Sequence, residues 1–133
     1  MNHNFFQGVI LAGGRASRLF PLNRHFPKPL MPICNRPLIA FQLENMRSLG
    51  IFEVFVVYSS FKELLKEELA KPEYNEFQIE FIEQKKPMGI AHALHCVEPF
   101  VSKPLAVFLG DIFILASRLP QLTNIYNNTR PCN

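Results

Sequence analysis

The chain has 133 residues, of which 48% are hydrophobic and 19% charged, and its formal net charge is +3. This composition indicates a globular domain and excludes a disordered chain, and no run of like charges indicates a nucleic-acid-binding tail. The longest apolar stretch, residues 104–116, is interrupted by Asp111 and is shorter than the roughly 20 residues that span a bilayer, so we expect no membrane segment. The first residues lack the basic and apolar regions of a signal peptide.

The basic residues are unevenly distributed. Residues 1–43 contain no Asp or Glu, whereas the remaining 90 residues carry a net charge of −2. A positive field around one segment suits a polyphosphate ligand, although chance clustering is the alternative explanation. The basic residues of this segment are Arg15, Arg18, Arg24, Lys28 and Arg36.

The first predicted strand, Val9–Ala12, runs into Gly13 and Gly14. Glycines after a buried strand let backbone N–H groups approach an anion closely, and Arg18 and Lys28 follow with fixed positive charges. The plainer interpretation is a simple turn. A P-loop and a dinucleotide fingerprint are both excluded, because residues 13–18 read Gly-Gly-Arg-Ala-Ser-Arg.

The rest of the chain predicts alternating strands and helices. Pro37 and Gly50 bracket an apolar helical face, and Ser60 and Glu63 form a capping-box pattern that opens the next helix. The alternation predicts an α/β fold with a mainly parallel sheet and helices on both of its faces. The predicted strands are 53–58, 77–83 and 105–109, and the predicted helices are about 38–49, 60–71, 89–97 and 119–126.

Two side chains at strand ends are candidates for ligand contacts. Asp111, the single Asp of the chain, follows Gly110 at the carboxyl end of a strand, where it could bind Mg²⁺ or serve only as a turn residue. The amide of Gln84 can pair with a nucleotide base through a donor and an acceptor, or it is a solvated loop residue. His92 and His95 are expected to be packing or surface residues.

The cysteines are Cys34, Cys96 and Cys132. Their odd number and wide spacing indicate neither a disulfide framework nor a zinc site. Reducing conditions fit this pattern best, so we expect a cytoplasmic protein.

Several motifs together resemble the signature of the sugar-1-phosphate nucleotidyltransferases, or nucleotide-diphospho-sugar pyrophosphorylases. The resemblance covers about residues 7–115, with Ala16 and Ile112 departing from the usual glycine and asparagine. It implies a Rossmann-like nucleotidyltransferase fold. The matching segments are Leu11–Gly14, Ser17–Leu19, Pro21–Leu22, Pro27–Ile33, Asn35–Ile39, Gln84–Ala93 and Phe108–Asp111.

The resemblance also implies roles for individual residues. A nucleoside triphosphate would react with a sugar 1-phosphate to give a nucleotide sugar and pyrophosphate. Arg18 would stabilise the leaving phosphates, Lys28 would hold the α-phosphate and the sugar phosphate, and Asp111 would bind Mg²⁺. The implied nucleotide-binding residues are Leu11, Ala12, Gly13, Gly14, Gln84 and Gly89.

Family catalytic domains are roughly twice as long as this chain and use a second metal-binding Asp, for which residues 1–133 offer no candidate. We therefore expect an incomplete fold, namely the N-terminal nucleotide-binding part of one domain. An open strand edge would favour homo-oligomers. A non-catalytic nucleotide-binding or regulatory homologue and an inactive fragment remain alternatives, and neither the base nor the sugar follows from the sequence.

Overall fold

The computed structural model describes residues 5–13, 21, 26–115 and 119–129. Its main sheet has four strands in the order β5-β4-β1-β6, and every neighbouring pair is parallel. All five residues of β1 are buried, because this strand pairs on both sides. The strands are β1 (Gln7–Leu11), β4 (Glu53–Tyr58), β5 (Gln78–Glu83) and β6 (Leu105–Leu109).

The strand order changes direction between β1 and β6. The chain moves outward from β1 to β4 and β5, and then returns across the sheet to place β6 on the other side of β1. Parallel strands separated in this way leave a crevice beyond their carboxyl ends, which is where open α/β sheets bind ligands. The pairing of Leu11 with Leu109 sets the register at this crevice.

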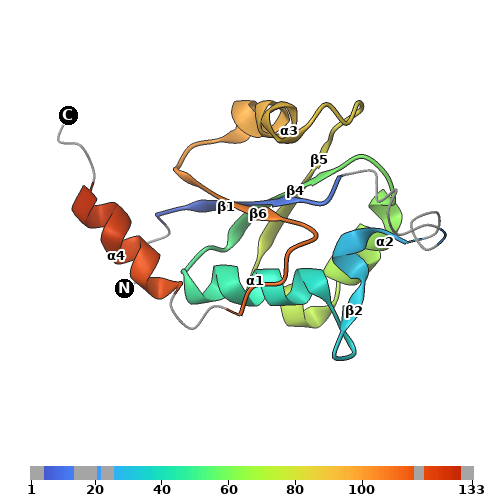
Figure 1. Cartoon of the computed structure of the whole chain (residues 1–133), viewed down its shortest axis with the longest axis horizontal. Coiled ribbons are helices and arrows are strands. Elements are labelled where there is room, and N and C mark those ends of the chain that lie inside the picture. Colours follow the sequence, from blue (N-terminus) through green and yellow to red (C-terminus); the bar gives the residue numbers. More distant parts are fainter. Residues whose placement is uncertain (1–4, 14–20, 22–25, 116–118, 130–133) are drawn as a thin grey trace.

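One face of the sheet is covered by α1 (Leu38–Ser48) and α2 (Lys62–Leu69) (Figure 1). Side chains alternate along a strand, so Ile10 of β1 points to this face. It joins a core that includes Ile39 and Leu43 of α1 and Leu65 of α2, all fully buried or nearly so. Helix α1 follows Pro37 and ends before Gly50, whose φ of 71° supplies the left-handed residue of a helix end.

The opposite face is covered by α3 (Ile90–Val97), which lies on the other side of the sheet in Figure 1. Val9 and Leu11 point to this face and pack with Ala93 and Val97 of α3. This confirms the predicted α/β fold with a parallel sheet and helices on both faces.

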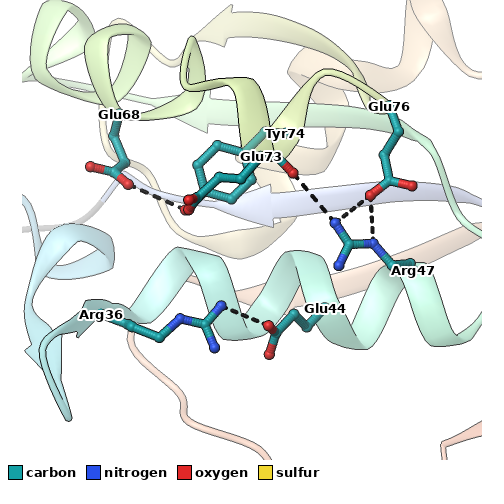
Figure 2. Close-up of polar contacts among 7 residues, drawn as sticks. All are labelled: Arg36, Glu44, Arg47, Glu68, Glu73, Tyr74 and Glu76. Carbon is teal, nitrogen blue, oxygen red and sulfur yellow. Dashed lines mark hydrogen bonds and ion pairs between the residues drawn. The ribbon is translucent and has the colours of Figure 1, made fainter.

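Polar contacts tie α1 to the segment that follows α2 (Figure 2). The Arg47 guanidinium donates from Nε to Glu76 at 2.5 Å and from Nη2 to the backbone oxygen of Glu73 at 3.4 Å. The Tyr74 hydroxyl donates to Glu68 at 3.2 Å, and burial is the main reason that the pKa of Tyr74 is raised. The contacted segment includes the short helix η4 (Pro72–Tyr74).

The predicted capping box at Ser60 is wrong. The residue before α2 is Phe61 in a left-handed conformation with φ 59°, and no side chain caps the helix. The remaining elements are a hairpin of β2 (Pro32–Ile33) and β3 (Arg36–Pro37), the short helices η3 (Lys28–Leu30) and η5 (Glu98–Phe100), and α4 (Pro120–Thr129). Among the described residues, no helix combines the length and apolarity needed to cross a membrane.

Candidate nucleotide-binding cleft

A cleft of about 450 Å³ lies beyond the carboxyl ends of the strands. Residues far apart in the chain meet there because β1, β5 and β6 all end at this side of the sheet. Seven of the nine predicted site residues line it: Leu11, Ala12, Gly13, Lys28, Gln84, Gly89 and Asp111. The other two, Gly14 and Arg18, lie outside the described residues.

The β1 and β6 ends are joined at Gly110. Its backbone N–H donates to the Leu11 oxygen at 2.9 Å, continuing the strand pairing into the turn. A Cβ at this position would overlap the Leu11 oxygen and lie 2.9 Å from Cγ of Pro29. Glycine is therefore required for the close approach that carries Asp111 to the rim of the cleft.

Lys28 and Asp111 form what we call the charged corner. Lys28 begins the short helix η3 between Pro27 and the buried Pro29, which restricts the backbone that carries it. Its Nζ lies 3.3 Å from Oδ2 of Asp111, and the two side chains are 31% and 51% exposed. An ion pair with this exposure contributes only about 0–1 kcal/mol, so both groups can exchange partners with a ligand at little cost.

Gln84, Gly89 and His92 form what we call the amide corner. Gln84 follows β5, is only 3% exposed, and uses Nε2 to contact the Gly89 oxygen at 3.2 Å and Nδ1 of His92 at 3.0 Å. Gly89 has φ 96° and precedes α3, a conformation that disfavours any side chain. These contacts join groups without formal charge, and Gln84 is buried, His92 half-buried and Gly89 exposed.

Two residues with roles in this geometry were missed from the sequence. Gln42 of α1 is 2% exposed and donates to the Leu109 and Ile112 oxygens at 2.6 and 3.3 Å, so it holds both sides of the Asp111 turn. Its own Oε1 is buried and has no hydrogen-bond partner among the described residues. The available signal was a polar side chain at a position of the apolar face of α1.

His92 was the second omission. It was expected to be a packing or surface residue, and it is a half-buried one whose ring contacts the Gln84 amide, a specific partner that the sequence did not indicate. His95, one turn further along α3, is exposed and pairs with Glu98 at 2.8 Å, as a surface residue would. The signal for His92 was its position three residues after Gly89, on the side of the helix that faces the preceding loop.

The carboxylates of the described residues do not gather into a metal cage, since no group of three His, Cys, Asp or Glu lies close enough to hold an ion. Asp111 is a single, half-exposed carboxylate beside the cleft. Mg²⁺ is commonly held by one or two carboxylates together with waters and substrate phosphates, so this donor set fits such an ion.

Comparison with known proteins gives a consistent family. The family model described as Nucleotidyl transferase matches residues 7–130. A low-salt glycan biosynthesis nucleotidyltransferase of Haloferax volcanii is 34% identical over 107 residues, which are 79% of this chain and 30% of that protein. A UTP–glucose-1-phosphate uridylyltransferase of Bacillus subtilis is 28% identical, over 92% of this chain and 50% of that protein.

A D-glycero-alpha-D-manno-heptose 1-phosphate guanylyltransferase of Campylobacter jejuni is 34% identical, over 80% of this chain and 48% of that protein. Among solved structures, a UDP-glucose pyrophosphorylase complexed with UDP-glucose has a TM-score of 0.82 at 23% identity, over 92% of this chain and 53% of that chain, which shows a shared fold. The chain spans half or less of the length of the three curated relatives named here.

Proposed function

Because this chain belongs to the nucleotidyl transferase family, we propose that it takes part in nucleotidyl transfer from a nucleoside triphosphate to a sugar 1-phosphate. The products would be a nucleotide sugar and pyrophosphate. The observation that carries the proposal is the meeting of Lys28, Asp111 and Gln84 in one cleft at the carboxyl ends of parallel strands. Residues 1–133 would form the N-terminal nucleotide-binding part of the catalytic domain.

In the proposed reaction, a phosphate oxygen of the sugar 1-phosphate attacks the α-phosphorus of the nucleotide. The bond between the α- and β-phosphates breaks, and pyrophosphate leaves with the electron pair. Such a transfer depends on in-line positioning and on neutralising charge on the phosphates. Lys28 is a point charge at the rim of the cleft and would hold the α-phosphate and the sugar phosphate, while Arg18 would stabilise the leaving pyrophosphate.

The nucleotide would lie along the end of β1. Leu11, Ala12 and Gly13 line the cleft, and Gly13 has no side chain to separate a ligand from the backbone. The proposed nucleotide-binding set also includes Gly14, Gln84 and Gly89. Gln84 and Gly89 stand away from the charged corner and would contact the base.

Asp111 would hold Mg²⁺ at the charged corner, with the phosphates and water as further ligands. A bound Mg²⁺ supplies Lewis-acid stabilisation of phosphate charge. One of the two carboxylate oxygens, Oδ2, pairs with Lys28, so Mg²⁺ could bind the other oxygen or replace the ammonium. In either case the Lys28 ammonium lies at the cleft where the phosphates would bind.

The proposal extends to the cellular setting. Cys34 and Cys96 are free thiols, and this supports a reducing compartment such as the cytoplasm. Among the described strands β6 lies at an edge of the sheet, and its Val107 is 40% exposed. A homo-oligomer is part of the proposal, and the mass in solution would test it.

The test compares two arginines of the same segment. Pyrophosphate release is measured with a panel of nucleoside triphosphates and sugar 1-phosphates. We expect Arg18→Ala to lower turnover by about 10²–10³-fold, because a preorganised charge stabiliser is lost. Arg24→Ala, the matched control, is expected to have little effect, since Arg24 does not lie on a motif position. Equal effects of the two changes would contradict the assignment.

A further inference from the structure

Gln42 presents its side-chain nitrogen, and not its oxygen, to the turn that carries Asp111. Nε2 lies 2.6 Å from the Leu109 oxygen and 3.3 Å from the Ile112 oxygen, and both carbonyl oxygens can only accept hydrogen bonds. Rotating the amide by half a turn would place its own oxygen against these two, inside a site where Gln42 is 2% exposed. Burial makes that arrangement costly, so the –NH₂ group is committed to the turn.

The two bonded oxygens belong to the first and last residues of this turn. The Ile112 N–H donates to the Leu109 oxygen at 3.2 Å, which closes the segment as a β-turn. The Gly110 N–H donates to the Leu11 oxygen at 2.9 Å. The turn is thus held at both ends by α1 and in its middle by β1, and these contacts enclose the backbone of Asp111.

Stability alone does not account for an amide at this position. The oxygen of the Gln42 amide, Oε1, is buried and has no hydrogen-bond partner among the described residues. An unpaired buried acceptor lowers stability, whereas a methionine of similar length would fill the same space without one. The Leu109 oxygen would still accept from the Ile112 N–H. The unfavourable oxygen is explained by the hold that the amide nitrogen has on the turn, as is common at functional sites.

Helix α1 supports both members of the charged corner. At its start, the Leu38 N–H donates to the Met31 oxygen at 2.9 Å, and Met31 directly follows η3, the short helix that begins with Lys28. One turn further along α1, Gln42 reaches the turn that carries Asp111. The same helix therefore sets the spacing between the backbones that carry the ammonium and the carboxylate.

We infer that Gln42 is a positioning residue for metal-dependent binding, because it fixes the turn on which the Asp111 carboxylate meets a Mg²⁺ carried by the bound triphosphate. The inference rests on the proposed function, which puts Mg²⁺ at the charged corner. Asp111 is a single, half-exposed carboxylate, so a loose turn would have to be ordered each time the metal bound, and that ordering would weaken binding. Gln42 does not line the cleft and acts through the backbone of the turn.

The test measures triphosphate binding to the whole chain by calorimetry, once in Mg²⁺ and once in EDTA. UTP, dTTP, GTP, CTP and ATP are titrated first, and the one that binds the unaltered protein most tightly is used throughout. We expect Gln42→Met to weaken binding in Mg²⁺ by about tenfold, the effect typical of removing a group that orients a metal ligand. Binding in EDTA should change by about twofold or less, because Lys28 and the end of β1 are unaltered.

Two other glutamines provide matched controls for the change to methionine. Gln7 is also buried, but its oxygen accepts from the N–H groups of Ser102 and Lys103 at the end of the sheet opposite the cleft. Gln7→Met should lower the melting temperature more than Gln42→Met does, because two backbone donors lose their acceptor, and it should leave the effect of Mg²⁺ unchanged. Gln78→Met alters an exposed side chain of β5 and should change neither quantity.

A thermal melt of each variant accompanies the binding measurement. We expect Gln42→Met to melt within about 4 °C of the unaltered protein, since it loses two hydrogen bonds but also an unpaired oxygen. Equal weakening with and without Mg²⁺, an unchanged response to Mg²⁺, or failure of the variant to fold would overturn the inference. So would a loss of the Mg²⁺ effect in Gln7→Met as large as in Gln42→Met.

Hydrogen exchange in the unaltered protein tests the geometry independently of any variant. We expect the side-chain amide hydrogens of Gln42 to exchange more slowly than those of the exposed Gln78, and equal rates would overturn the inference. Triphosphate binding that Mg²⁺ does not strengthen would overturn the inference and leave the nucleotide-binding part of the proposed function standing. Failure of every triphosphate to bind would overturn both.

Discussion

The two ends of the cleft are built in opposite ways. The amide corner has a nearly buried amide held by hydrogen bonds between groups without formal charge, whereas the charged corner has two opposite charges that are 31% and 51% exposed. A buried hydrogen bond is costly to break, because the groups left behind lose their partners. An exposed ion pair is cheap to open, because water solvates both charges. One end is therefore suited to a fixed selection, and the other to an exchange of partners.

Replacing the carboxylate of the charged corner is expected to have the largest effect. Asp111→Asn keeps the size and one carbonyl oxygen but loses the charge that a hard cation requires. We expect a loss of Mg²⁺-dependent activity of about 10²-fold or more, with thermal stability changed little, since the exposed ion pair contributes only about 0–1 kcal/mol. A titration of pyrophosphate release against Mg²⁺, beside a thermal melt, measures both.

Glu44→Gln is the matched control for this change. Glu44 is a half-exposed carboxylate that pairs with Arg36 at 2.6 Å (Figure 2), and neither residue lines the cleft. If activity in Asp111→Asn keeps the same Mg²⁺ dependence as in this control, the carboxylate does not hold the metal. That result would contradict the view that the charged corner exchanges its ion pair for a metal ligand.

A second change acts on the support of the charged corner. In Gly110→Ala the added methyl group meets the backbone oxygen of Leu11, which cannot move without disturbing the pairing of β1 and β6. We expect a destabilisation of about 1–3 kcal/mol, measured by denaturant unfolding. It would show that the exposed charges depend on a rigid backbone contact.

Gly8→Ala provides the comparison for Gly110. There the added Cβ would lie 2.8 Å from Sδ of Met46 and 3.1 Å from Cγ2 of Ile51, which are side-chain atoms and can adjust more readily than a backbone oxygen. We expect a clearly smaller loss than for Gly110→Ala. Equal losses of unfolding free energy in Gly8→Ala and Gly110→Ala would mean that the Leu11 oxygen does not make position 110 more sensitive to an added methyl group.

The smallest effect is expected at Glu53. Like Asp111 of the charged corner it forms an ion pair, and like the groups of the amide corner it contacts a glutamine amide. Glu53, at the other end of the sheet, accepts a hydrogen bond from Gln7 at 2.9 Å and pairs with Lys103. The Lys103 contact is the main cause that lowers the pKa of Glu53, with Gln7 second. The carboxylate therefore stabilises the fold above its unfolded pKa near 4.5, and this contribution is lost as pH falls through the lower folded pKa.

Glu53→Gln tests this arrangement. At neutral pH we expect a loss of stability below about 1 kcal/mol, because the side chain is partly solvated. Urea unfolding at a series of pH values should show a shallower acid decline below pH 4.5 than in the unaltered protein. An unchanged slope would show that the contacts with Gln7 and Lys103 add nothing to folding.

The elements of the fold were largely predictable because their signals are local. The segment 53–58, rich in Val and Phe, became β4 with the same bounds, and the helix after Pro37 formed as expected. The start of α2 was not predictable, because Phe61 takes a left-handed conformation that no local pattern indicated. Strand order is equally absent from local patterns, since it depends on how distant segments pack.

The residues of the candidate site also fall into those with a local sequence signal and those without one. Gly13, Lys28 and Asp111 were identified because each lies on a motif position, and the structure brings them to one cleft. Gln42 and His92 were missed, since each matters through a hydrogen bond to a partner elsewhere in the chain. A polar side chain on an otherwise apolar helical face is the signal that could have drawn attention to Gln42.

The loop that follows Gln84 and the turn that follows β6 differ in how much sequence change they can accept. Among the strands described, β5 and β6 each pair on one side only, but Gly110 after β6 leaves no room for a Cβ beside the Leu11 oxygen, whereas residues 85–88 are exposed. Exposed loop residues can be replaced with less disturbance to the sheet than a glycine held against a neighbouring strand. The loop before α3 is therefore expected to accumulate substitutions over evolution, while the turn that carries Asp111 stays the same.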